Sequence, residues 1–149
     1  MKVGVEIDMV VPDSVKALEL YENVFGAERV EVTAYDRGLN EAVFTLFGTR
    51  FHLLDENEAY QLFAPKEGER RPMWLNILVP DIEATLEKAK QHGFAEIQPL
   101  TVLAEMGVSN AILSDPFGYV WMLHQVHRVV SFEERTKLWD EKMKSEGNV

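Results

Sequence analysis

Two stretches of this chain alternate apolar and polar positions with the period of a β-strand. Every second residue is apolar over residues 3–11, and residues 73–79 repeat that pattern. A Val-Pro-Asp junction closes each stretch at Asp13 and Asp81, where an aspartate suits the cap of a helix. Each half of the chain is therefore predicted to open with a strand, a tight junction and a helix.

The two halves repeat the same order of elements 68 positions apart. Each predicted helix stops at a glycine, Gly26 or Gly93, which tolerates the left-handed conformation of a helix end. Internal repetition of this kind indicates two copies of one supersecondary unit. Three further strands are expected in each half, at residues 29–35, 41–47 and 50–55 and at residues 96–102, 108–113 and 120–126.

The predicted architecture is a single α+β domain over residues 1–149. It contains a first βαβββ module at residues 1–56, a polar linker at 57–72 and a second βαβββ module at 73–127. The two modules are expected to form a curved mixed sheet, and a C-terminal helix follows at residues 131–146.

The C-terminal helix has an apolar stripe of its own. Ser131 with Glu134 three residues later forms a capping box. Phe132, Trp139 and Met143 make the narrow stripe, which we expect to pack against the chain's own sheet. A partner subunit is the alternative contact, and a mainly structural or interaction role carried by this helix is a third hypothesis for the whole protein.

The amino-acid composition excludes several classes of binding partner and of chemical site. The net charge is −10 and the only basic doublet is Arg70-Arg71, whereas proteins that bind nucleic acid carry a basic surface. The absence of cysteine excludes disulfides, zinc–thiolate sites and thiol nucleophiles. No apolar run reaches the ~20 residues that span a bilayer, and acids near the start exclude a secretory signal. We expect a cytoplasmic protein with no nucleic-acid or membrane partner.

The faces of the opening strands that point away from the helices are mixed in character. They carry Glu6 and Asp8 in the first half, and Trp74 and Asn76 in the second. Acids on the inner face of a curved sheet are costly unless they meet water, a partner or a ligand. The pattern therefore predicts a hydrated cup lined by both halves, in which a small molecule binds.

The motifs resemble those of the vicinal-oxygen-chelate superfamily (glyoxalase, bleomycin resistance and dioxygenase proteins). The resemblance rests on the Val-Pro-Asp junctions, on Leu20-Tyr21 followed by Gly26, and on Asp-Pro-Phe-Gly-Tyr-Val-Trp at residues 115–121. The last string, with the helix after it, looks most like the PhnB-like branch. The resemblance implies the glyoxalase/dihydroxybiphenyl dioxygenase-like fold and a homodimer.

The same resemblance implies where a divalent metal would bind. The ligand-equivalent positions are Glu6 and His52 in the first half, and Trp74 and Met122 in the second. A carboxylate and an imidazole suit a divalent ion, but an indole has no ring lone pair to donate and a thioether is a poor ligand for such ions. Two protein ligands are fewer than catalytic metals usually take. A displaced set that recruits His124 would restore a third.

Two main functional hypotheses stay open, and they use the same residues. In the first, the protein binds a small molecule without a metal: Trp74 and Met122 contact its apolar or aromatic body, while Glu6, His52 and Asn76 fix its polar end. In the second, Glu6 and His52 hold a divalent metal ion, and the protein is a lyase, isomerase or dioxygenase acting on vicinal oxygens. The candidate catalytic residues are Glu6 and His52, and the candidate ligand-binding residues are Asp8, Trp74, Asn76, Met122 and His124.

The protonation state of Glu6 bears on both hypotheses. If Glu6 is enclosed beside Trp74, burial should raise its pKa and make the carboxylate a proton acceptor.

Overall fold

Each of the two Pro-Asp junctions ends a strand and starts a helix, and its aspartate caps that helix as predicted. In the computed structural model, which describes residues 3–69 and 72–147, the Asp13 carboxylate accepts a hydrogen bond from the Lys16 N–H at 3.1 Å. Asp81 accepts from the Ala84 N–H at the same distance. Both aspartates have the extended backbone expected of an N-cap.

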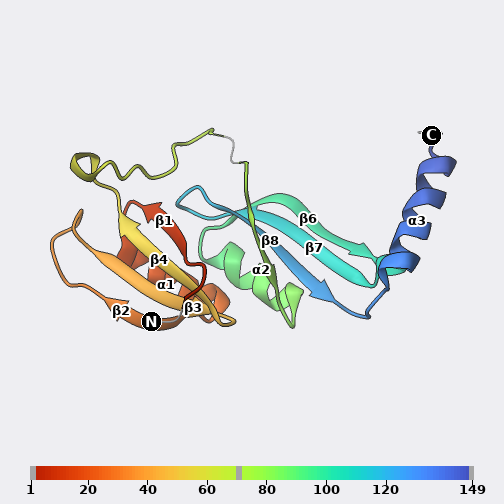
Figure 1. Cartoon of the computed structure of the whole chain (residues 1–149), viewed down its shortest axis with the longest axis horizontal. Helices are drawn as coiled ribbons and strands as arrows, with labels where there is room; N and C mark the ends of the chain where they lie inside the picture. The colour runs from red at the N-terminus through yellow and green to blue at the C-terminus, as the bar shows by residue number, and fades with distance from the viewer. Residues whose placement is uncertain (1–2, 70–71, 148–149) are drawn as a thin grey trace.

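The first module is one four-stranded sheet with a helix on one face (Figure 1). The strand order is β1-β4-β3-β2, with β1 parallel to β4 and the other pairs antiparallel. Its elements are β1 (Ile7–Val11), α1 (Ser14–Phe25), β2 (Glu28–Val32), β3 (Glu41–Leu46) and β4 (Thr49–Asp55).

The second module repeats that topology in a second four-stranded sheet. The order is β5-β8-β7-β6, again with the opening strand parallel to the last one. The predicted duplication and α+β class are therefore confirmed. The elements are β5 (Leu75–Leu78), α2 (Ile82–Gln91), β6 (Ala95–Leu103), β7 (Val108–Ser114) and β8 (Val120–Val126), with 3-10 turns η1 (Glu58–Tyr60) and η2 (Ala104–Met106).

Several boundaries differ from the sequence prediction. The opening strand starts at Ile7 rather than at residue 3, because β4 pairs with it only from Ile7 onward. The segment between the modules, expected to be a plain linker, contains η1 and an isolated bridge between Asn57 and Leu62. The basic doublet Arg70-Arg71 lies outside the described residues.

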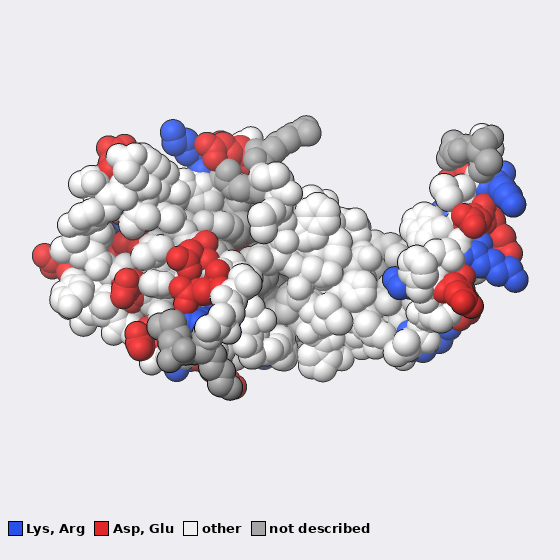
Figure 2. Space-filling model, viewed as in Figure 1, with Lys and Arg blue, Asp and Glu red and all other residues white. Residues whose placement is uncertain are grey.

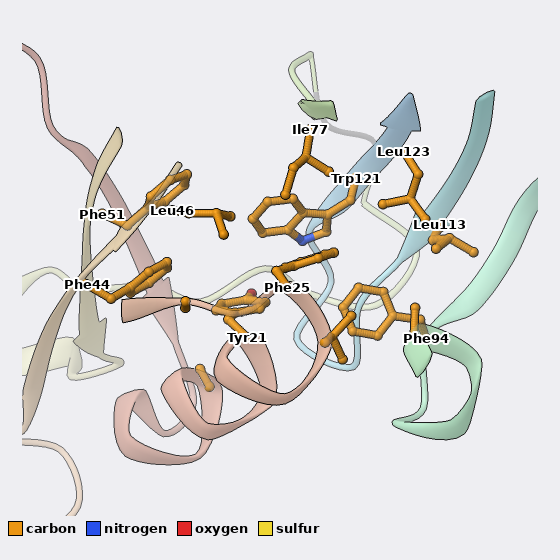
Figure 3. Packing of buried hydrophobic residues seen from close by; sticks show 14 of the residues in the cluster. Tyr21, Phe25, Phe44, Leu46, Phe51, Ile77, Phe94, Leu113, Trp121 and Leu123 are labelled. Carbon is orange, nitrogen blue, oxygen red and sulfur yellow. The ribbon is translucent and has the colours of Figure 1, made fainter. Parts of the chain in front are cut away.

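The helix-facing sides of both sheets bury one shared aromatic core (Figure 3). Tyr21 and Phe25 of α1 point toward Trp121 of β8, with ring centroids 5.3 Å and 4.7 Å from the indole. Phe94 closes the far side of Phe25 at 5.7 Å. Because aromatic rings bury large apolar areas, this contact joins the two modules into one hydrophobic unit.

A buried hydrogen-bond network reinforces that contact. The Tyr21 hydroxyl donates to Asp115 Oδ2 at 2.5 Å, and the Trp121 indole N–H donates to the same oxygen at 3.0 Å. The other carboxylate oxygen accepts from the N–H groups of Phe117 and Tyr119, each at 2.9 Å. Burial raises the pKa of Asp115, and these donors counteract part of that effect. Asp115 shapes the turn between β7 and β8, and it also anchors α1 of the other module.

The C-terminal helix α3 (Phe132–Ser145) extends away from both sheets (Figure 1). None of its described residues is buried, and Phe132 is 71% exposed. The expectation that its apolar stripe packs on the chain's own sheet is therefore wrong. The segment before α3 explains why the helix points away from the sheets. Val130 is buried and Arg128 donates to the Glu105 carbonyl, so the chain is held at the end of the second sheet and α3 starts beyond it.

Within the described ranges, no helix combines the length and apolar character needed to cross a bilayer.

Replacing Tyr21 tests the network between the modules. Tyr21→Phe removes one donor from a buried carboxylate and should lower the free energy of unfolding by about 1–3 kcal/mol in urea denaturation. The matched control is Tyr35→Phe, because that ring is 67% exposed; it should change stability by less than ~0.5 kcal/mol. Equal effects of the two substitutions would contradict the assigned role.

Candidate functional site

Charged side chains gather on the face of the first sheet that points away from α1. Asp8 and His52 are direct neighbours in the parallel pairing of β1 and β4. Glu6 and Arg50 lie two positions earlier in each segment, so strand alternation places all four side chains on one face. Figure 2 shows acidic groups collected on the first module, while the surface of the second module in that view is almost free of charge.

The members of this cluster are joined by hydrogen bonds. His52 Nδ1 lies 3.0 Å from Glu6 Oε1, and His52 Nε2 lies 3.3 Å from Glu41 Oε2. Arg50 donates from Nε to the other Glu6 oxygen, Oε2. Asp8 Oδ1 stands 4.0 Å from His52 Nδ1. Both oxygens of Glu6 and both ring nitrogens of His52 are thus already engaged.

The charges of this cluster shift two carboxyl groups in opposite directions. Arg50 holds the pKa of Glu6 below its usual value, chiefly through their hydrogen bond. The condition for a raised pKa at Glu6, enclosure beside Trp74, is not met, because a guanidinium group rather than an indole is its main neighbour. Partial burial raises the pKa of Asp8, and the nearby Glu6 carboxylate adds to that effect.

The candidate residues of the second module lie on the outer face of its own sheet. Asn76 pairs with Met122 across β5 and β8, and Leu78 pairs with His124. His124 Nδ1 is buried without a hydrogen-bond partner among the described residues. In the part of the chain that the structure describes, no hydrogen bond or ion pair connects these side chains to Glu6 or His52.

A pocket at the seam between the modules does bring two candidate residues together. Asp8 from β1 and Trp74, just before β5, line the same cavity of about 260 Å³. Trp74 is 55% exposed, which leaves its ring accessible. The wall is otherwise mostly apolar and includes Met73, Leu75, Tyr119 and Val120. A neighbouring cavity of about 270 Å³ contains Asn76.

The first module offers donors of the right chemistry for a divalent ion. Glu6, Asp8 and His52 can each contribute one ligand atom, and these atoms lie within 4.8 Å of one another. However, the Arg50 guanidinium already forms an ion pair with the Glu6 carboxylate. A metal ion that used Glu6 as a ligand would have to displace Arg50. The donor set thus suits a divalent ion in its chemistry, but not while Glu6 is bonded to Arg50.

Arg50 and Glu41 were not identified as site residues from the sequence. Arg50 precedes His52 by two positions on one strand, so alternation alone could have placed both on the same face. The predicted strand at residues 41–47 already began at Glu41, but no local pattern indicated that this first residue of β3 reaches His52 across the sheet. Only the pairing of β3 with β4 shows that contact.

A larger cavity of about 620 Å³ lies at the far end of the second module. It contains the start of α2 and a hydrogen-bonded pair, Ser109 Oγ and His127 Nε2, at 2.8 Å. His127 faces the helix side and lies apart from the His124 face, as strand alternation predicts. None of the candidate residues lines this cavity, so the seam pocket is the better candidate despite its smaller volume.

Known proteins share this fold and its sequence pattern. A family model described as the Glyoxalase/Bleomycin resistance protein/Dioxygenase superfamily matches residues 5–123. Similar solved structures include the fosfomycin resistance protein FosX from Listeria monocytogenes complexed with Mn(II) and sulfate, with a TM-score of 0.67 at 18% identity, covering 93% of this chain and 99% of that chain. TioX from Micromonospora sp. ML1 has a TM-score of 0.62 at 17% identity, covering 85% and 100%. Identities this low show the shared fold alone, and no curated protein matches this chain.

The raised pKa of Asp8 predicts a pH-dependent gain in stability for Asp8→Asn. Since the folded protein disfavours ionised Asp8, the wild type loses stability as pH rises from the unfolded pKa to the folded pKa. Asp8→Asn should therefore melt higher at neutral pH, by less than ~2 °C because the group is half exposed. The difference should vanish at pH values where Asp8 is protonated in both states.

The matched control for this measurement is Asp140→Asn on the exposed helix α3, which should leave the melting temperature unchanged at every pH. A lower melting temperature for Asp8→Asn at neutral pH would contradict the assignment.

Proposed function

Because the chain belongs to the glyoxalase/bleomycin resistance protein/dioxygenase superfamily, we propose that it is a small-molecule-binding protein that holds its ligand without a catalytic metal ion. The observation that supports this proposal most strongly is the seam pocket. An accessible indole from one module and a carboxylate from the other line it together. An apolar concavity with few polar groups is the usual form of a small-molecule site.

The residues around the seam have distinct proposed roles. The ring of Trp74 stacks on an aromatic or planar part of the ligand. Asp8 lies at the pocket, and Glu6 and His52 extend the polar surface beside it. We assign the polar end of the ligand to this side.

The outer face of the second sheet completes the proposed site. Asn76, Met122 and His124 are adjacent across β5 and β8.

A metal-dependent enzyme is the second candidate function. The close approach of donor atoms from Glu6, Asp8 and His52 favours it. A FosX variant from Listeria monocytogenes was solved with Mn(II) and 1S,2S-dihydroxypropylphosphonic acid. In this chain the reaction would be that of a lyase, isomerase or dioxygenase acting on vicinal oxygens.

We further propose that the protein is a cytoplasmic homodimer of the PhnB-like branch. The exposed stripe of Phe132 and Trp139 on α3 supports a subunit contact, because large apolar side chains exposed together often mark an interface. The net charge of −10 favours neither nucleic acid nor an anionic membrane surface as a partner.

A thermal-shift screen of planar aromatic compounds and antibiotics tests the ligand proposal. A compound at ~100 times its Kd should stabilise the wild type by about 2.7 kcal/mol and raise Tm by several degrees. Trp74→Ala should weaken binding of the same compound at least ~10-fold, since a lost stacking contact of ~1.4 kcal/mol has that effect.

Trp139→Ala is the matched control, because this indole is also half exposed but lies on α3. It should bind the compound as the wild type does. Failure of every compound to stabilise the wild type, or an undiminished shift in Trp74→Ala, would contradict the proposed site.

A further inference from the structure

We propose that Arg50 takes the place of a metal ion in this site: its guanidinium supplies the positive charge that organises Glu6 and excludes divalent cations from the donor set. This inference rests on the proposed metal-free function, and it identifies Arg50 as the residue that keeps a metal ion out of the site.

The contacts around Glu6 support the replacement. Arg50 Nε bonds Oε2 of Glu6, while His52 Nδ1 lies 3.0 Å from Oε1. The two side chains of the Arg50–Glu6 pair are about one-third exposed, so the pair is partly shielded from solvent. A cation that used Glu6 as a ligand would have to break this ion pair.

The charge balance of the cluster favours a nearby cation. Three carboxylates, from Glu6, Asp8 and Glu41, surround the one imidazole of His52. Like charges at this spacing repel one another and favour a positive partner. Among the ion pairs of the described residues, Arg50 is the one Arg or Lys that contacts this cluster.

The second module offers no suitable metal ligands at the positions equivalent to Glu6 and His52. Trp74 and Met122 stand at the positions equivalent to Glu6 and His52 in the repeat, and neither suits a divalent ion. A metal here would depend on the first module alone. The Arg50 guanidinium needs no ligand from the second module, because it binds the Glu6 carboxylate alone.

Removal of Arg50 should therefore uncover a latent metal site. Glu6, Asp8 and His52 would then offer three donors whose atoms lie within 4.8 Å. Three protein ligands are the number that open metal sites commonly use.

Titration of tag-free protein with Mn(II), followed by the electron paramagnetic resonance signal of free Mn(II), tests this inference. We expect the wild type to bind weakly and Arg50→Met to bind one ion per chain at least ~10-fold more tightly, the scale of effect seen when groups bonded to metal ligands are changed. Adding His52→Ala to Arg50→Met should abolish the gain. The matched control is Arg29→Met, which removes a 2.8 Å ion pair with Glu22 elsewhere in the same module and should gain nothing.

The inference would be overturned if folded Arg50→Met gains no Mn(II) affinity, or if Arg29→Met gains as much. Circular dichroism checks folding, and Arg50→Gln replaces Arg50→Met if the latter does not fold. Tight stoichiometric binding by the wild type would contradict both this inference and the metal-free function. A weakly binding wild type with no gain in the variant would overturn the role of Arg50 alone, and the ligand screen would still stand.

Discussion

The buried hydrogen bond from Tyr21 to Asp115 is the constraint on which the arrangement of the two modules depends. It joins a helix of the first half to the last hairpin of the second, and the Trp121 indole N–H shares the same carboxylate oxygen. A buried carboxylate is tolerated only when its oxygens are paired, so these donors determine how the halves meet. That packing places β1 beside β5 and creates the seam pocket lined by Asp8 and Trp74.

The duplicated modules have kept one architecture and diverged in surface chemistry. The outer face of the first sheet is a charged network centred on Glu6 and His52, whereas the second offers Asn76 and Met122. Figure 2 shows the same contrast, with acidic side chains on the first module and little charge on the second. A ligand at the seam would meet the Asp8 carboxylate on one side and the Trp74 indole on the other. A solved FosX structure with the same fold contains Mn(II), and the metal-free function proposed for this chain rests on the asymmetry between its modules.

Local patterns predicted most of the fold, and only part of the site. Period-two alternation located the strands, and Asp13 and Asp81 proved to be helix caps, because both signals act within a few residues. Alternation also placed Glu6 and Asp8 on one face, whereas His52 came from the family resemblance and its pairing with Asp8 from the structure. The bond between Tyr21 and Asp115 spans 94 positions and left no local signal. The ion pair of Arg50 with Glu6 was missed for a related reason: a charged strand residue gives no indication of its partner until the sheet register is known.

The proposed site is an organised carboxylate–imidazole cluster whose cation is the chain's own Arg50. Metal analysis by inductively coupled plasma mass spectrometry, on tag-free protein purified without chelator, tests it most directly. The account predicts manganese, zinc, iron, nickel and cobalt each far below one atom per chain. One equivalent of any of these metals, lost in Glu6→Gln and His52→Ala, would contradict it.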